Sequence, residues 1–361
     1  MKFAHFAHIW GKPGMTPHQR YEQLWRELAL CDTLDFDYAF CVEHHFRPDE
    51  SWSSSPSMYV VGAGARTRNM RIGAMGYIVP LYNSLRLAEE IALADQMLGG
   101  RLEVGLVPGI NPAYFEPFGL DYDARKSPTL EYVDYLRAAY GTQPFSFAGE
   151  HHNTASATLA VLPAQRPHPP LWMQSRDPET LEFCAANGMH TGYFLIFPRP
   201  DAAPRYRKFL ADWDAAGWDY RPNIAYSTIV YVDETDQKAL DTALYRASRA
   251  YEGFLPPPQP GESFEDRVAK HAVKFNERGE DGAAQIMANL FDPDYLMENE
   301  LVFIGSPDTV TAKLKAAATS GVFNTFMGEF NFSDLPEEDL MRSIRLFGEH
   351  VIPALHDYEP F

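Results

Sequence analysis

Residues 38–46 read Tyr38-Ala-Phe-Cys-Val-Glu43-His44-His45-Phe46, an apolar run that stops on a carboxylate and two imidazoles. A short, nearly continuous apolar run is typical of a strand in a parallel sheet. Parallel α/β proteins build their sites at the C-terminal ends of such strands. This stretch therefore predicts a fold class and the place of its chemistry. An isolated His-His pair is more often an ordinary strand end, so a functional site here is indicated only if the neighbouring segments also point to one.

Similar runs recur along the chain with helix-like segments between them. Helix signals include Thr16-Pro17, an N-cap with a first-turn proline, and Gly99-Gly100, a C-terminal stop. The alternation has no linker, so it favours a single-domain (β/α)8 TIM barrel over residues 1–361 rather than a doubly wound sheet. No Gly-rich dinucleotide fingerprint follows the first run, which also disfavours the doubly wound sheet. The expected strands are 3–9, 38–42, 71–79, 102–106, 171–174, 191–197, 224–232 and 322–326.

Two stretches interrupt this rhythm. Residues 144–162 are expected to form a surface hairpin. Residues 253–300 open with Pro256-Pro257-Pro258. From composition alone, this second insertion is equally well explained as a mobile lid or as a surface excursion with solvated charges.

Composition narrows the class of protein and partner. The 361 residues carry a net charge of −18, which disfavours nucleic acid and anionic membranes as partners. The notable apolar run at 193–197 is far too short to span a bilayer. Cys31, Cys41 and Cys184 are widely spaced, as in proteins whose core thiols stay reduced. We expect a soluble, cytoplasmic protein.

In a barrel, the residues that end the strands meet on one rim. Aromatic residues and glycines with few charges are typical of a site for a flat, mostly apolar ligand. His44 and His45 are consecutive, so they should point to opposite faces, and we expect one imidazole in the cavity and no metal centre. The rim is expected to collect Trp10, Glu43-His44, Met75-Gly76-Tyr77, Pro108-Gly109-Ile110, Gln174-Ser175-Arg176 and Phe194–Phe197.

Two motifs on this rim allow two interpretations each. Gln174-Ser175-Arg176 precedes a proline-started helix, where free N–H groups, the helix dipole and Arg176 favour an anion such as phosphate. The alternative, which these residues alone favour, is an ordinary N-cap with a solvated arginine. The glycines of Arg71-Ile-Gly-Ala-Met-Gly76 either relieve crowding in a buried strand or let a planar ring approach the backbone.

In combination, several motifs resemble the bacterial luciferase-like flavin monooxygenases, and the resemblance spans nearly the whole chain. It is strongest between Phe36 and Gly109. The segment Trp172–Thr180 is more similar to the limonene-monooxygenase branch. The motifs are Phe36-Asp37-Tyr38 through Phe46, Arg71–Pro80, Ala88–Arg101, Val104–Gly109 and Ile304-Gly305-Ser306-Pro307.

The resemblance implies a TIM barrel that binds reduced FMN (FMNH2) and uses O2, through a C4a-hydroperoxide, to oxygenate a small apolar substrate. It also implies a separate NAD(P)H:flavin reductase, and a homodimer, or a heterodimer with a related subunit, that pairs through the helices after the second and third strands. By position, His44 matches the catalytic histidine and Glu43 a residue beside the flavin. Further matches are Ala74, Met75 and Gly76 in the strand with a cis Met75-Gly76 bond, Gln174, Ser175 and Arg176 at the phosphate end, and His271, Lys274 and Arg278 in the lid.

Two positions depart from the luciferase pattern. Pro108 replaces a phosphate-contacting arginine, so Arg176 is expected to take over that task. Val107 stands where luciferase has a reactive cysteine, so light emission does not carry over. Chemically, such an enzyme needs a dry cavity, a lid and an imidazole whose pKa, ordinarily roughly 6.5, allows proton exchange near neutral pH.

Three alternatives stay open on the sequence. One is an oxidoreductase that uses the deazaflavin F420 on the same barrel. Another is a non-catalytic flavin-binding subunit, although the presence of both Glu43 and His44 argues against it. The third is a metal-dependent TIM-barrel hydrolase that uses His44 and His45.

Overall fold

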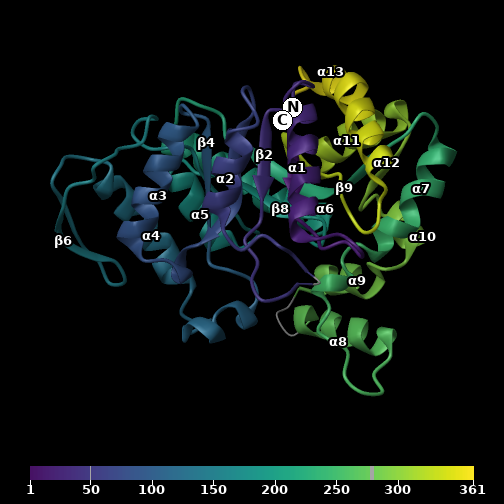
Figure 1. Cartoon of the computed structure of the whole chain (residues 1–361), viewed down its shortest axis with the longest axis horizontal. Coiled ribbons are helices and arrows are strands. Elements are labelled where there is room, and N and C mark those ends of the chain that lie inside the picture. Colours follow the sequence, from purple (N-terminus) through teal and green to yellow (C-terminus); the bar gives the residue numbers. More distant parts are fainter. Residues whose placement is uncertain (49, 277–279) are drawn as a thin grey trace.

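The chain folds into a closed barrel of parallel strands wrapped by helices (Figure 1), in a computed structural model that describes residues 1–48, 50–276 and 280–361. The barrel strands lie side by side in chain order, and β1 closes the ring against β11. The predicted TIM barrel is therefore confirmed. Its strands are β1 (Lys2–Ala7), β2 (Tyr38–Cys41), β3 (Arg71–Ile78), β4 (Leu102–Val107), β7 (Leu171–Gln174), β8 (His190–Phe194), β9 (Ile224–Val232) and β11 (Thr325–Glu329).

Three strands have a boundary that differs from the prediction by two residues or more. β1 ends at Ala7, not residue 9, and β8 ends at Phe194, not residue 197. The last strand starts at Thr325 because Val322 is the C-cap of the preceding helix, with a left-handed φ of 56°. An unpredicted short strand, β10 (Phe303–Gly305), pairs with β9 outside the ring.

Helices cover the outside of the barrel. Thr16 caps α1 as predicted: its hydroxyl accepts from the Gln19 N–H, and the Gln19 side chain accepts from the Thr16 N–H. Among the described residues, no helix combines the length and apolarity needed to cross a bilayer. The covering helices are α1 (Pro17–Cys31), α2 (Pro56–Gly64), α3 (Ser84–Met97), α4 (Lys126–Ala139), α5 (Pro178–Ala186), α6 (Arg199–Ala216), α7 (Asp236–Arg249), α11 (Pro307–Gly321), α12 (Glu337–Leu346) and α13 (Ile352–Leu355).

Strand alternation divides the core into two layers. One set of side chains fills the barrel interior, and the other packs between the barrel and the helices, because successive residues of a strand face opposite sides. The interior set includes Phe6, Phe40, Met75, Trp172 and Met327. The three cysteines are free and buried, as expected.

Residues 144–162 and the segment 264–276 project from different sides of the molecule (Figure 1). Residues 144–162 contain β5 (Phe145–Ala148) and β6 (Asn153–Ala157), which pair antiparallel. Residues 253–300 contain the helices α8 (Phe264–Asn276), α9 (Asp281–Asn289) and α10 (Pro293–Glu298). Arg278 of the predicted lid lies outside the described residues.

Candidate active site

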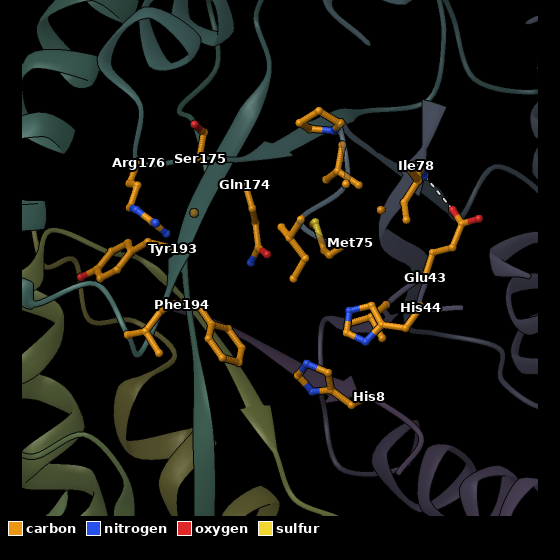
Figure 2. A pocket seen from close by; sticks show the side chains of 18 of the residues that line it. His8, Glu43, His44, Met75, Ile78, Gln174, Ser175, Arg176, Tyr193 and Phe194 are labelled. Atoms are coloured by element: carbon orange, nitrogen blue, oxygen red, sulfur yellow. Dashed lines mark hydrogen bonds between the residues drawn. The ribbon is translucent and has the colours of Figure 1, made fainter. Parts of the chain in front are cut away.

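A cavity of about 260 Å³ opens at the C-terminal ends of the barrel strands. Its wall is largely apolar, with an imidazole pair on one side and Arg176 on the other (Figure 2). Of the predicted site residues, those that line it are Glu43, His44, Met75, Gly76, Gln174, Ser175 and Arg176, alongside Phe6, His8, Phe194, Phe197 and Phe254.

His44 is a buried imidazole with a carboxylate behind it. Its Nδ1 lies 2.9 Å from Oε1 of Glu50, and the Tyr114 hydroxyl donates to the same carboxylate. Burial lowers the pKa of His44, and this outweighs the opposing effect of Glu50. For Glu50, burial raises the pKa, but the contacts with His44, Tyr114 and Arg47 outweigh it and leave the pKa below its ordinary value. The site therefore holds a neutral imidazole next to an ionised carboxylate near neutral pH.

Glu43 ties the ends of two strands together. Its carboxylate accepts hydrogen bonds from the Ile78 N–H (2.6 Å), the Tyr82 hydroxyl (2.8 Å) and Nε2 of His45 (3.0 Å). His45 thus packs behind Glu43 while His44 faces the cavity, which is the arrangement predicted from strand alternation. In the described part of the chain, no group of three or more His, Cys, Asp or Glu side chains is arranged to hold a metal ion.

The third strand brings backbone to the cavity wall. The Met75–Gly76 peptide bond is cis, as the resemblance implied. A Cβ on Gly76 would lie 2.5 Å from the Gly105 carbonyl, so close packing of β3 on β4 accounts for this glycine without any ligand. Ala74 is not among the described residues that line the cavity: its side chain packs in the outer core layer, because it alternates with Met75.

Arg176 brings positive charge to the other end of the cavity, but carboxylates already contact both this guanidinium and the start of helix α5. Asp177 caps α5 and accepts from the Thr180 N–H (3.1 Å), so the helix N-terminus is covered by its own carboxylate. Arg176 pairs with Glu280, which precedes α9, at 2.5 Å between Nη2 and Oε2. An anion here would depend on Arg176 rather than on free helix N–H groups, and it would have to compete with Glu280.

A second imidazole, His8, was missed in the sequence. Nδ1 of His8 lies 2.9 Å from both carboxylate oxygens of Glu329, and the Trp10 indole N–H donates to the same group. The strand was expected to reach residue 9, which placed His8 inside it. Because β1 ends at Ala7, His8 is in fact the first side chain of the rim.

The cavity is suited to a flat ring with an anionic tail. Phe6, Phe194 and Phe197 supply apolar walls, and Arg176 is the cation at one end. Its volume is slightly below the roughly 300–1,000 Å³ of most ligand sites, and Arg176 and Phe254 are among the side chains that line it. A planar ring system with a phosphate-bearing tail is the kind of cofactor that these residues could hold.

Sequence comparison places the chain among known proteins. Residues 1–324 match the family model described as luciferase-like monooxygenase. The chain is 32% identical over 188 residues to the uncharacterised protein y4wF of Sinorhizobium fredii (52% of this chain, 54% of y4wF), so that alignment spans about half of the relative. It is 23% identical over 248 residues to the oxygenase component of the flavin-dependent trigonelline monooxygenase of Acinetobacter baylyi, covering 66% of this chain and 67% of that protein.

Solved structures share the fold. The oxygenating constituent of 3,6-diketocamphane monooxygenase from Pseudomonas putida, in complex with FMN, superposes with a TM-score of 0.80 at 18% identity over 98% of each chain. The coenzyme F420-dependent tetrahydromethanopterin reductase of Methanopyrus kandleri does so with a TM-score of 0.68 at 19% identity, again over 98% of each chain. Because the family model matches most of the chain's length, the chain belongs to the luciferase-like monooxygenase family.

Proposed function

We propose that this protein is the oxygenase of a two-component system that uses FMNH2 and O2 to oxygenate a small, largely apolar organic molecule. The observation that carries the proposal is the arrangement in Figure 2: a neutral, carboxylate-backed His44 faces Arg176 across an apolar cavity. When bound, reduced FMN supplies the two electrons with which O2 is activated.

The chain's own residues divide the work. Arg176 binds the phosphate, with the Gln174 and Ser175 side chains beside it in the cavity wall. The backbone at Met75–Gly76 lines the cavity where it would support a flavin ring, and Glu43 fixes the ends of β2 and β3. The phenylalanines exclude water, which would otherwise destroy a reactive oxygen species. His44 exchanges a proton at Nε2 while Glu50 holds its Nδ1.

The experiment is oxygen uptake with chemically reduced cofactor. FMNH2 should support substrate-dependent oxygen incorporation, whereas reduced F420 should not. In His44→Gln, flavin should still bind while oxygen is released as hydrogen peroxide instead of entering product. Normal product yield per FMNH2 in this variant would contradict the assignment of His44. Hydride transfer from F420 without oxygen uptake would favour the second candidate, an F420-dependent oxidoreductase, which the likeness to the M. kandleri fold supports.

Two partners belong to the same proposal. A separate NAD(P)H:flavin reductase would supply FMNH2, as the words "oxygenase component" in the name of the A. baylyi relative suggest. A second copy or a related subunit would pack on α2 and α3, whose surfaces expose Met58, Leu93 and Met97.

A further inference from the structure

We propose that His8 and Glu329 form a substrate-side proton acceptor, and that the substrate therefore carries an acidic hydroxyl, as in a phenol or a stable enol. This inference rests on the proposed function and specifies its substrate class. It gives the cavity two imidazoles with separate tasks: His44 for the oxygen chemistry and His8 for the substrate.

The first argument is the tautomer of His8. An ionised carboxylate can only accept hydrogen bonds, and both oxygens of Glu329 lie 2.9 Å from Nδ1 of His8. Nδ1 therefore donates to the carboxylate, and Nε2 is the ring nitrogen that can accept a hydrogen bond. Within the described residues, Nε2 of His8 has no hydrogen-bond partner, although the side chain lines the cavity. The cavity thus presents an acceptor, whose complement is a donor such as a hydroxyl.

The second argument is that Glu329 is built to support a proton on His8. Glu329 is 1% exposed, and the Trp10 indole N–H also donates to it, so the carboxylate is held in place. A carboxylate at Nδ1 stabilises the imidazolium that forms when Nε2 takes a proton, as in the catalytic triads of hydrolases. This is more than packing requires, because an apolar residue would fill the same space at a lower desolvation cost.

The third argument is the shape of the surroundings. Three aromatic rings surround His8 in T-shaped arrangements, with ring centroids 5.1 Å away for Phe6, 5.8 Å for Phe194 and 5.5 Å for Phe254. These walls are suited to an aromatic ring whose polar group points at Nε2. Arg176 lies across the cavity from His8 (Figure 2), so a flavin phosphate there leaves His8 for the substrate.

The proton step is balanced within the pair. The O–H bond of the substrate breaks, its proton forms an N–H bond at Nε2 of His8, and no electrons are transferred. The result is an aryloxide beside an imidazolium–carboxylate pair. The extra electron density on the ring carbons favours attack on an electrophilic oxygen. The ring centroids of His8 and His44 are 5.6 Å apart, so a second positive charge on His44 is disfavoured while His8 holds the proton.

The test uses 4-nitrophenol, whose phenolate absorbs in the visible, and 4-nitroanisole, its methyl ether without the proton. Both are titrated into the flavin-free protein at a pH where free 4-nitrophenol is mostly neutral. We expect 4-nitrophenol to bind at least tenfold more tightly than 4-nitroanisole and to show the phenolate band. In His8→Gln the two probes should bind equally and without the band, and in Glu329→Gln the band should weaken. His44→Gln and the exposed control His151→Gln should retain it.

Equal binding of the two probes to the wild-type protein, bound nitrophenol without the phenolate band, or a band that survives in His8→Gln would each overturn the inference. The wild-type titration gives this answer even if a variant fails to fold. FMN binding, followed by quenching of flavin fluorescence without the phenol, is measured in parallel. Loss of FMN binding contradicts the proposed function, whereas an absent phenolate band with intact FMN binding contradicts only the role of His8.

Discussion

Each imidazole in the cavity has a carboxylate at its Nδ1: Glu50 for His44 and Glu329 for His8. The two carboxylates come from different parts of the chain, a loop after β2 and the end of β11. In the His8 pair the carboxylate accepts a hydrogen bond from Nδ1 and so sets which nitrogen carries the hydrogen, whereas in the His44 pair Glu50 lies within ion-pair distance of Nδ1. The direction of proton transfer is thus set by residues that do not themselves need to touch the reacting molecule.

Replacing Glu50 with Gln should shift the pH dependence of oxygenation. Glu50 raises the pKa of His44 against the larger effect of burial, which lowers it. Without this charge the pKa falls further, so the acid limb of the activity profile, where His44 becomes protonated, should move to lower pH. The rate should also fall, by about 10²-fold, because the ring is no longer oriented.

The measurement is product yield per FMNH2 across the pH range, with the exposed Glu116→Gln as control. An acid limb at the same pH in Glu50→Gln would show that Glu50 does not act through His44.

The sequence alone identified His44 but not the side chains that contact it. The motif Glu43-His44-His45 stands out because it ends an apolar run. Glu50 lies in a turn and Tyr114 in the short 3-10 helix Pro112–Tyr114, where no periodicity marks them, and Glu329 meets His8 only because the barrel closes β11 against β1. The misplaced end of the first strand concealed His8. Loop residues and barrel closure are long-range effects that a local pattern does not carry.

Among the elements, the segment before α9 bears most directly on cofactor binding. Glu280 forms an ion pair with the Arg176 guanidinium. Arg47 donates hydrogen bonds to the Gly253 and Leu255 carbonyls at the start of the same insertion (2.7 and 2.9 Å). The insertion is thus tied to the mouth of the cavity at two points. An incoming phosphate must replace Glu280 at Arg176.

Replacing Glu280 with Gln should therefore tighten FMN binding by roughly threefold to tenfold, since the loss of one partly exposed ion pair corresponds to about 1 kcal/mol. Riboflavin, which has no phosphate, should bind with unchanged affinity. Fluorescence titration of both ligands measures this, with Glu262→Gln, another ion-paired glutamate of the insertion, as control. Equal changes for FMN and riboflavin would show that Glu280 does not compete with the phosphate.

Helix α1 is anchored to the barrel by a buried charge cluster around Glu27. The carboxylate contacts Nε2 of His5 and Nη1 of Arg20, each at 3.0 Å, and accepts from the Asn331 amide. Burial raises the pKa of Glu27, but Arg20, His5 and Asn331 outweigh it and lower the pKa from 4.5 to about 2. Leu24, Leu28 and Cys31 recur at steps of three and four residues and form the buried apolar face of this helix. Periodicity gave no sign that Glu27 lies on the same face.

Glu27→Gln should destabilise the protein by ~3–5 kcal/mol, because it leaves Arg20 and His5 buried without their partner. The lowered pKa also sets the sign of the pH dependence: the stabilisation is complete above pH 4.5 and is lost as the pH falls through about 2. Urea unfolding between neutral and acid pH should show this loss in the wild-type protein and a smaller one in Glu27→Gln. The exposed Glu22→Gln should behave like the wild type. Equal acid sensitivity in Glu27→Gln would contradict the assignment.

For the whole molecule, the order and class of the barrel elements could be predicted from the sequence, but the short additional strand β10 could not. Runs such as 224–232 and 171–174 matched their strands to the residue, because a strand buried on both faces is apolar throughout. β10 was missed because it has only three residues. Gly76 was assigned either to crowding or to a ligand, and only the packing of β3 on β4 shows that crowding suffices.

The outer surface leads to a prediction about assembly. Met58 of α2 and Leu93 and Met97 of α3 are 77%, 50% and 60% exposed, and the two helices are neighbours. A double substitution, Leu93→Asp with Met97→Asp, should convert the proposed dimer into a monomer and leave flavin binding intact. Sedimentation velocity measures the mass, with the exposed Val273→Asp of α8 as control. An unchanged mass in the double variant, or a monomeric wild-type protein, would exclude this interface.

A crystal structure of the protein from a crystal soaked with FMN would show directly whether the cavity binds the flavin beside His44. We expect the phosphate at Arg176 with Glu280 displaced, and the flavin ring within contact distance of the Met75–Gly76 backbone and of His44. A cavity without flavin, or a flavin bound with its ring away from His44, would contradict the proposed cofactor site.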